Sequence, residues 1–171
     1  MTLIKICGLT TVSDAVDVAR AGADLIGVNV WPGSPRAGTI ERAREIFRAV
    51  RALGAEASRL VLLDVSPDPA RLRERVLELV PDMVQIVGEW AGQGEFAGVP
   101  VLRAFAVGSR ADLAALAVWS ADPVLLDARV AGMAGGTGVR IDEELLVGLA
   151  RPYILAGGLT PANVSDGIAT V

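Results

Sequence analysis

The sequence lacks histidine altogether, and it has few aromatic residues, a single cysteine and no long hydrophobic run. Its 171 residues include no His, one Cys and 4% aromatic side chains. Without histidine, the commonest acid–base side chain of enzymes, proton transfer must use a thiol, a carboxylate, an amine or a phenol. One cysteine excludes an internal disulfide and is typical of a reducing compartment, so we predict a cytoplasmic protein. No apolar run approaches the roughly 18 residues of a membrane-spanning helix, so no membrane partner is expected.

The charge balance is mildly acidic. Sixteen Lys and Arg against twenty Asp and Glu give a formal net charge of −4. A general nucleic-acid-binding protein needs the opposite sign, so we expect no nucleic-acid partner. A small anionic ligand remains compatible, because it needs only local cations or backbone N–H groups. The sequence also lacks a cluster with metal-ligand spacing, so no metal site is predicted.

Continuous apolar runs alternate with amphipathic segments along the whole chain. Hydrophobic residues make up 52% of the sequence, and Val/Ile/Leu runs of this kind are typical of parallel strands buried on both faces. Repeated β-α units form either an open doubly wound sheet or a closed barrel. We expect strands at 3–7, 24–30, 59–65, 83–87, 100–106, 123–127 and 153–156, and helices at 11–21, 40–53, 69–80, 110–119, 142–150 and 161–169.

Two chemically useful side chains stand at the ends of predicted strands. Cys7 ends the first apolar run, and Asp127 ends a later one, just before a glycine-rich segment. The carboxyl ends of such strands are where parallel α/β barrels carry out their chemistry. The alternatives are that Cys7 is a small core residue and that Asp127 caps a helix or orders a loop. Asp64 follows a similar aliphatic run, and there we expect a structural role.

Three further features suggest ligand binding. Arg36 lies in the loop after the second strand, where its guanidinium suits a carboxylate, although a surface arginine would have the same sequence context. Gly157 and Gly158 directly precede a predicted helix, as in an anion cradle or a tight turn. Gly136 belongs to a glycine-rich loop that suits a lid or a close approach to ligand. Arg103, at the end of the fifth strand, would add positive charge.

Five blocks of sequence occur in a specific order. They are KICGLT (5–10), GVNVWPGSPR (27–36), VQIVGEW (84–90), VLLDARVAGMAGGTG (124–138) and ILAGGLTPANV (154–164). In this order and spacing the chain resembles the phosphoribosylanthranilate isomerases from its first residues to its last. The resemblance implies a (β/α)8 TIM-barrel fold of the α/β class. It also implies the Amadori rearrangement of N-(5-phosphoribosyl)anthranilate, a step of tryptophan biosynthesis, with no cofactor.

The same resemblance implies a role for each candidate residue. Asp127 matches the family's general acid, which protonates the ring oxygen as the sugar opens, and Cys7 matches the general base. Arg36 would hold the anthranilate carboxylate. Gly157 and Gly158 would bind the phosphate of this small phosphorylated substrate. Gly136 would contact the substrate from the glycine-rich loop.

The chain departs from the family pattern in two places. Val87 stands where the family usually has histidine, so we expect altered substrate contact. Only seven strands can be recognised, and the sequence stops within the seventh predicted helix. We therefore expect residues 1–171 to form one barrel domain that is C-terminally incomplete, self-associates through an open barrel edge and has little activity as given.

Two other readings of the sequence stay open. One is an inactive or phosphate-binding barrel fragment. The other is a related isomerase of a histidine-pathway aldosylamine. Those enzymes favour an aspartate on the first strand, and Cys7 argues against this reading.

Overall fold

The computed structural model describes residues 2–54, 58–130 and 138–170. The chain forms two compact units, Met1–Val101 and Leu102–Val171, each an alternation of strands and helical segments. Gly136 falls outside the described residues. Within the described ranges no helix has the length and apolar character needed to cross a membrane.

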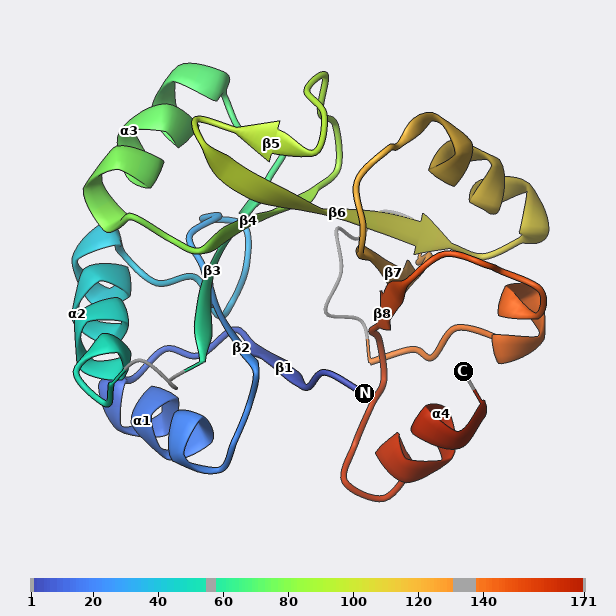
Figure 1. Cartoon of the computed structure of the whole chain (residues 1–171), viewed down its shortest axis with the longest axis horizontal. Coiled ribbons are helices and arrows are strands. Elements are labelled where there is room, and N and C mark those ends of the chain that lie inside the picture. The colour runs from blue at the N-terminus through green and yellow to red at the C-terminus, as the bar shows by residue number, and fades with distance from the viewer. Residues whose placement is uncertain (1, 55–57, 131–137, 171) are drawn as a thin grey trace. The chain divides into compact units, whose positions relative to one another are not determined.

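The first unit is a parallel sheet with three amphipathic helices. Its elements are β1 (Lys5–Cys7), α1 (Val12–Arg20), β2 (Leu25–Asn29), α2 (Ile40–Arg51), β3 (Arg59–Val65), α3 (Pro69–Leu79) and β4 (Met83–Val87). The strands pair in the order β1-β2-β3-β4, all parallel. Figure 1 shows the three helices along the same side of these strands. The predicted strands and helices of this unit are all present, with ends shifted by a few residues.

Each of the three helices begins with a capping side chain. The side chains of Thr11, Thr39 and Asp68 accept hydrogen bonds from backbone N–H groups three residues later, at 3.1, 3.2 and 2.9 Å. Such caps satisfy N–H groups that have no partner within the helix. Pro69 follows Asp68 at the first helical position, where its missing N–H costs nothing.

The pairing register divides the side chains of the first sheet between two faces. Cys7 pairs with Gly27, and Leu63 pairs with both Asn29 and Gln85. Because side chains alternate along a strand, these five residues share one face. The opposite face packs against the helices and is lined by fully buried aliphatic side chains.

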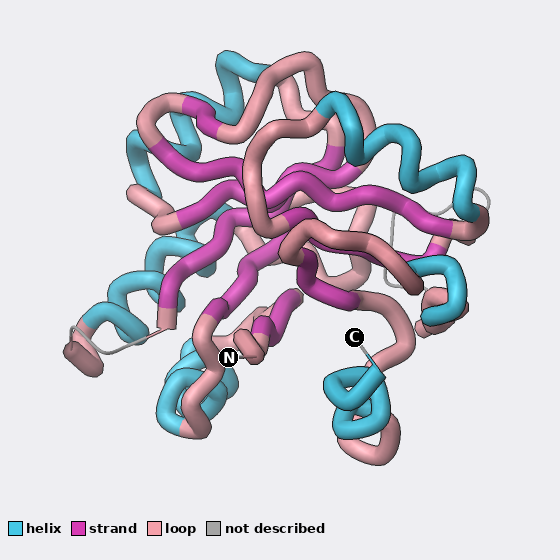
Figure 2. The backbone as a smooth tube through the Cα atoms, turned by 45° about the vertical axis from the view of Figure 1, so that its right-hand side comes forward, coloured by secondary structure: helices cyan, strands magenta, loops and turns pink. Residues whose placement is uncertain are grey.

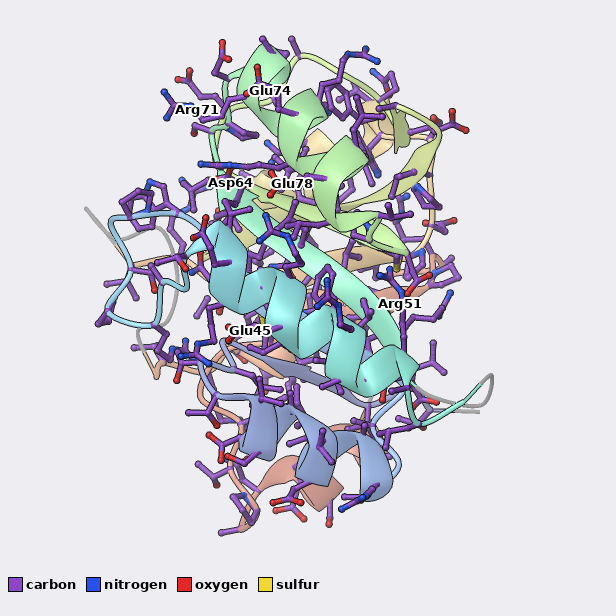
Figure 3. All side chains as sticks on the ribbon, turned by 90° about the vertical axis from the view of Figure 1, so that its left-hand side faces the viewer. Glu45, Arg51, Asp64, Arg71, Glu74 and Glu78 are labelled. Carbon is purple, nitrogen blue, oxygen red and sulfur yellow. The ribbon has the colours of Figure 1, made fainter. Side chains whose placement is uncertain are left out.

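Asp64 projects from that opposite face. It is almost fully buried, and it forms an ion pair with Arg75 of α3. Its Oδ1 also accepts a hydrogen bond of 2.9 Å from the Val65 N–H. Figure 3 shows Asp64 on the side of the sheet covered by helices α2 and α3. These contacts give Asp64 the structural role that we expected.

The second unit contains three parallel strands and shorter helical segments. Strand β6 (Val99–Val107) leads into it from the first unit, and β5 (Glu95–Phe96) pairs antiparallel with the start of β6. Strands β7 (Val124–Ala128) and β8 (Tyr153–Leu155) follow, in the order β6-β7-β8. Together with β1–β4 they account for the seven predicted strands. The two-residue β5 lies in the segment 88–98, for which no regular helix was predicted.

The helical segments of the second unit differ from the prediction. Those expected at 110–119 and 142–150 are 3-10 helices, η1 (Arg110–Val118) and η2 (Glu143–Leu146). Ser109 and Asp112 form a capping box, but η1 buries only Leu116 and therefore lacks the apolar stripe that sustains an α-helix. Helix α4 (Val164–Thr170) begins three residues later than expected, after a turn. Figure 2 shows this short helix in cyan, joined to β8 by a pink loop.

Candidate active site

The first unit brings Cys7 and Arg36 together. Arg36 lies in the loop between β2 and α2, and its Nη1 donates a hydrogen bond of 3.2 Å to the Cys7 backbone oxygen. The guanidinium passes over Gly8, where a Cβ atom would lie only 2.7 Å from Nη1. Gly8 also has φ of +80°, a conformation that side chains rarely adopt. The residue after Cys7 is therefore glycine for two reasons, its backbone angle and the approach of Arg36.

The Cys7 thiol occupies space that Gly27 leaves open. A Cβ at Gly27 would lie 2.6 Å from the Cys7 Sγ and 3.1 Å from the Lys5 Nζ. The half-buried thiol and the Lys5 ammonium thus share the site beside Gly27. Our sequence reasoning did not identify Lys5. Its position two residues before Cys7, on the same face of β1, was the signal for it.

The second unit places Asp127 at the end of β7. The carboxyl is half-buried, and its Oδ1 accepts a hydrogen bond of 2.8 Å from the Ala128 N–H. Burial raises the pKa of the Asp127 carboxyl above its ordinary value, and the Ala128 hydrogen bond opposes this in part. A raised pKa keeps the proton on the carboxyl to higher pH, as a general acid requires.

Gly157 lies against this carboxyl. A Cβ at Gly157 would lie 2.5 Å from the Asp127 Oδ1, and Gly157 has φ of +88°. Gly158 follows with φ of +60°, and its absent Cβ would lie 2.9 Å from the Arg140 backbone N. Two side chains at these positions would collide with the candidate acid and with the chain entering from Gly138. Gly157, one of the two glycines predicted to form an anion cradle or a tight turn, therefore directly adjoins Asp127.

Asn163 holds the glycine turn in place. Its Nδ2 donates a hydrogen bond of 3.0 Å to the Gly158 oxygen, and its Oδ1 accepts one of 2.8 Å from the Thr160 N–H. Residues 161–163 are a turn rather than the first turn of a helix, because α4 begins at Val164. The cradle consequently consists of loop backbone around Gly157 and Gly158, without an aligned helix N-terminus at Pro161.

Arg103 does not share the face that carries Asp127. Asp127 pairs with Ala106 of β6, whereas Arg103 alternates with Ala104 and so projects from the other face. There its guanidinium lies 5.5 Å from the centre of the Phe105 ring. Among the residues that the structure describes, no three Asp, Glu or Cys side chains form a group that could hold a metal ion.

Comparisons with known proteins agree on one family. Residues 4–171 match the family described as N-(5'phosphoribosyl)anthranilate (PRA) isomerase. The N-(5'-phosphoribosyl)anthranilate isomerase of Pseudomonas fluorescens (strain Pf0-1) is 42% identical over 172 residues, which cover 98% of this chain and 82% of that protein.

Solved structures of the same family share the fold. Phosphoribosyl anthranilate isomerase from Thermus thermophilus superposes with a TM-score of 0.82 at 29% identity, covering 99% of this chain and 83% of that one. A second phosphoribosyl anthranilate isomerase superposes with a TM-score of 0.79 at 26% identity, covering 100% of this chain and 83% of that one. That second structure is a complex with reduced 1-(o-carboxyphenylamino)-1-deoxyribulose 5-phosphate.

Proposed function

We propose that this chain, which belongs to the N-(5'-phosphoribosyl)anthranilate isomerase family, uses Cys7 and Asp127 for the two proton transfers of that family's reaction. Its enzyme class is that of its relatives, an isomerase of tryptophan biosynthesis with an α/β fold of the (β/α)8 type. The observation that carries the assignment is the half-buried Asp127 carboxyl, whose pKa is raised by burial and which stands against the Gly157 backbone.

The reaction opens the sugar ring and then moves a proton. Asp127 donates its proton to the ring oxygen as the C1–O bond breaks, and the nitrogen lone pair forms the C1=N bond of a protonated imine. The Cys7 thiolate then takes the proton from C2, and the C–H electrons form a C1=C2 bond while the imine electrons return to nitrogen. The resulting enol tautomerises to the ketose amine. The protonated imine is itself the electron sink, so the scheme uses no cofactor.

The two ends of the substrate carry negative charges that other residues would bind. Arg36 supports an anthranilate carboxylate, because a guanidinium offers parallel N–H donors and this one is fixed next to Cys7. The Gly157–Gly158 turn supports the phosphate, because two successive glycines with positive φ leave the backbone uncovered by side chains, as in anion-binding turns. Gly136 is proposed as a further substrate contact on the resemblance of its loop alone.

The decisive experiment separates binding from turnover. Relative to the unmodified protein, we expect Asp127→Asn to lose turnover of N-(5-phosphoribosyl)anthranilate while still binding the reduced product analogue in calorimetry. Arg36→Ala should instead raise KM, since it removes binding common to ground and transition states. Full turnover by Asp127→Asn would contradict the assignment. An unchanged KM in Arg36→Ala would mean that Arg36 does not bind the substrate.

We also propose that a second copy of this chain is a partner, through the β1 side of the first unit. Leu3, Ile4 and Ile6 are 41, 50 and 38% exposed, and β1 pairs only with β2 among the described strands of that unit. An apolar strand with one unpaired edge is prone to association. Sedimentation velocity should show dimers or larger species that Ile4→Lys reduces. A monomer at all concentrations would contradict this. The single thiol supports a cytoplasmic location.

A further inference from the structure

The side-chain carbonyl oxygen of Gln85 is buried in the first unit without a hydrogen-bond partner among the described residues. Gln85 lies on β4 and is 5% exposed, and its Oε1 accepts no hydrogen bond from the described residues. A buried polar atom that has lost water and gained no partner destabilises the folded state. Methionine or leucine would fill the position without that cost. The amide is therefore better explained by a partner that arrives with a ligand.

A second amide lies in the same row of the sheet. Asn29 and Gln85 both pair with Leu63, so they stand on either side of it on one face. Strands two apart are separated by about 10 Å, a gap that two amide side chains and one small group can span. The Asn29 orientation is fixed, because its Oδ1 accepts a hydrogen bond of 2.9 Å from the Trp31 N–H. Its Nδ2 is then a donor, and it donates to none of the described residues.

This row adjoins the candidate base. Asn29 follows Gly27 by two residues on β2, so it projects from the same face, and Gly27 is the residue that pairs with Cys7. All of these residues belong to the first unit. The Asn29 Nδ2 and the Gln85 Oε1 thus belong to a row of side chains two residues beyond the row of Cys7, toward the carboxyl ends of the strands.

The chemistry of the pair selects among the parts of the substrate. A carboxylate or a phosphate offers only acceptors, so it cannot donate the hydrogen bond that the buried Gln85 Oε1 lacks. A hydroxyl both donates and accepts, so neighbouring hydroxyls satisfy the Gln85 Oε1 and the Asn29 Nδ2 together. We propose that Asn29 and Gln85 bind the vicinal hydroxyls of the substrate's five-carbon sugar. This specificity role rests on the proposed function of the chain.

A binding experiment with matched ligands tests the proposal. The probes are the reduced product analogue, 1-(o-carboxyphenylamino)-1-deoxyribulose 5-phosphate in reduced form, and two versions that each lack one vicinal hydroxyl. We expect the unmodified protein to bind the complete analogue about tenfold or more tightly than at least one deoxy version. Gln85→Met should bind the complete analogue and that deoxy version with equal affinity. Asn29→Leu should reduce the difference in affinity between them. Gln93→Met makes the same exchange at an exposed position and should keep the full difference.

Stability measurements separate a ligand contact from a structural contact. The urea midpoint of Gln85→Met should equal or exceed that of the unmodified protein, because the variant removes a buried carbonyl oxygen that has no hydrogen-bond partner among the described residues. A lower urea midpoint, together with an equal loss of affinity for the complete analogue and the deoxy version, would mean that Gln85 serves packing and would overturn the proposal. Unchanged discrimination in Gln85→Met would also overturn it. Failure of the unmodified protein to bind the complete analogue would instead count against the proposed function.

Discussion

The two units of the chain hold their candidate catalytic groups in different ways. In the first, the Cys7 thiol lies beside the Lys5 ammonium, and Arg36 contacts the Cys7 backbone oxygen. In the second, the Asp127 carboxyl accepts a hydrogen bond from the Ala128 N–H and lies against Gly157. Burial raises the pKa of the Asp127 carboxyl, which favours the protonated form that a general acid needs. The two units thus differ in what surrounds the candidate group, with cationic side chains near Cys7 and backbone groups near Asp127.

The largest expected effects come from removing either group. Asp127→Asn and Cys7→Ala should each lower kcat by about 10²–10⁴, the usual contribution of one proton-transfer group. Affinity for the reduced product analogue should change little, because neither group carries most of the binding. Steady-state kinetics and calorimetry on the same preparations measure both. A Cys7→Ala variant with near-normal kcat would make the thiol a packing residue and remove the distinction between the units.

Gly157→Ala should damage the second unit's site specifically. The new Cβ would meet the Asp127 Oδ1 at 2.5 Å, and the residue would also have to adopt φ of +88°. Gly148→Ala is the matched control, because Gly148 has φ of +83° with nothing within 4 Å of its absent Cβ. Both variants should lose about 1–2 kcal/mol of stability to backbone strain. Only Gly157→Ala should also lose activity, and equal activities would mean that Asp127 accommodates the methyl group.

Replacing single arginines compares the internal supports of the two units. Arg75→Met leaves the buried Asp64 without its ion partner in the first unit, which should cost about 3–5 kcal/mol. In the second unit, Arg151 donates hydrogen bonds of 2.7, 3.0 and 2.7 Å to the backbone oxygens of Leu116, Trp119 and Ala121. Arg151→Met should cost about 1–3 kcal/mol. Urea unfolding of both variants measures the two losses in the free energy of unfolding. A larger loss in Arg151→Met than in Arg75→Met would contradict the prediction.

The fold of the first unit was more predictable from sequence than that of the second. Its strands are continuous aliphatic runs, and its helices combine a capping side chain with an apolar stripe, as in Thr39 followed by Ala43, Phe47 and Val50. The segment 110–118 has a capping box but no such stripe, so the sequence overstated it as an α-helix. Propensity at a helix start cannot supply the packing that sustains the turns that follow.

The candidate residues could be predicted from the sequence, but their contacts could not. The position of Cys7 and Asp127 at strand ends follows from the end of each apolar run. The contact of Gly157 with Asp127 depends on the register between β7 and β8 and on two positive φ angles, which residue types alone do not specify. The buried, unpartnered Oε1 of Gln85 is likewise a property of packing, since the sequence does not show that this glutamine is buried.

The smallest expected effect is a pH dependence that belongs to the second unit. Burial raises the folded-state pKa of Asp127 above its ordinary value of 3.8. Between these two pKa values the folded protein binds more protons than the unfolded chain, so the stability from this group is fully present below the ordinary pKa and declines as pH rises through the folded-state pKa. Asp127→Asn should remove this part of the stability profile, whereas Cys7→Ala should leave it in place. Urea midpoints measured across the acidic range compare the variants. The same titration should lower kcat as pH rises, because the acid loses its proton, so a kcat that increases through this range would make Asp127 act as a base.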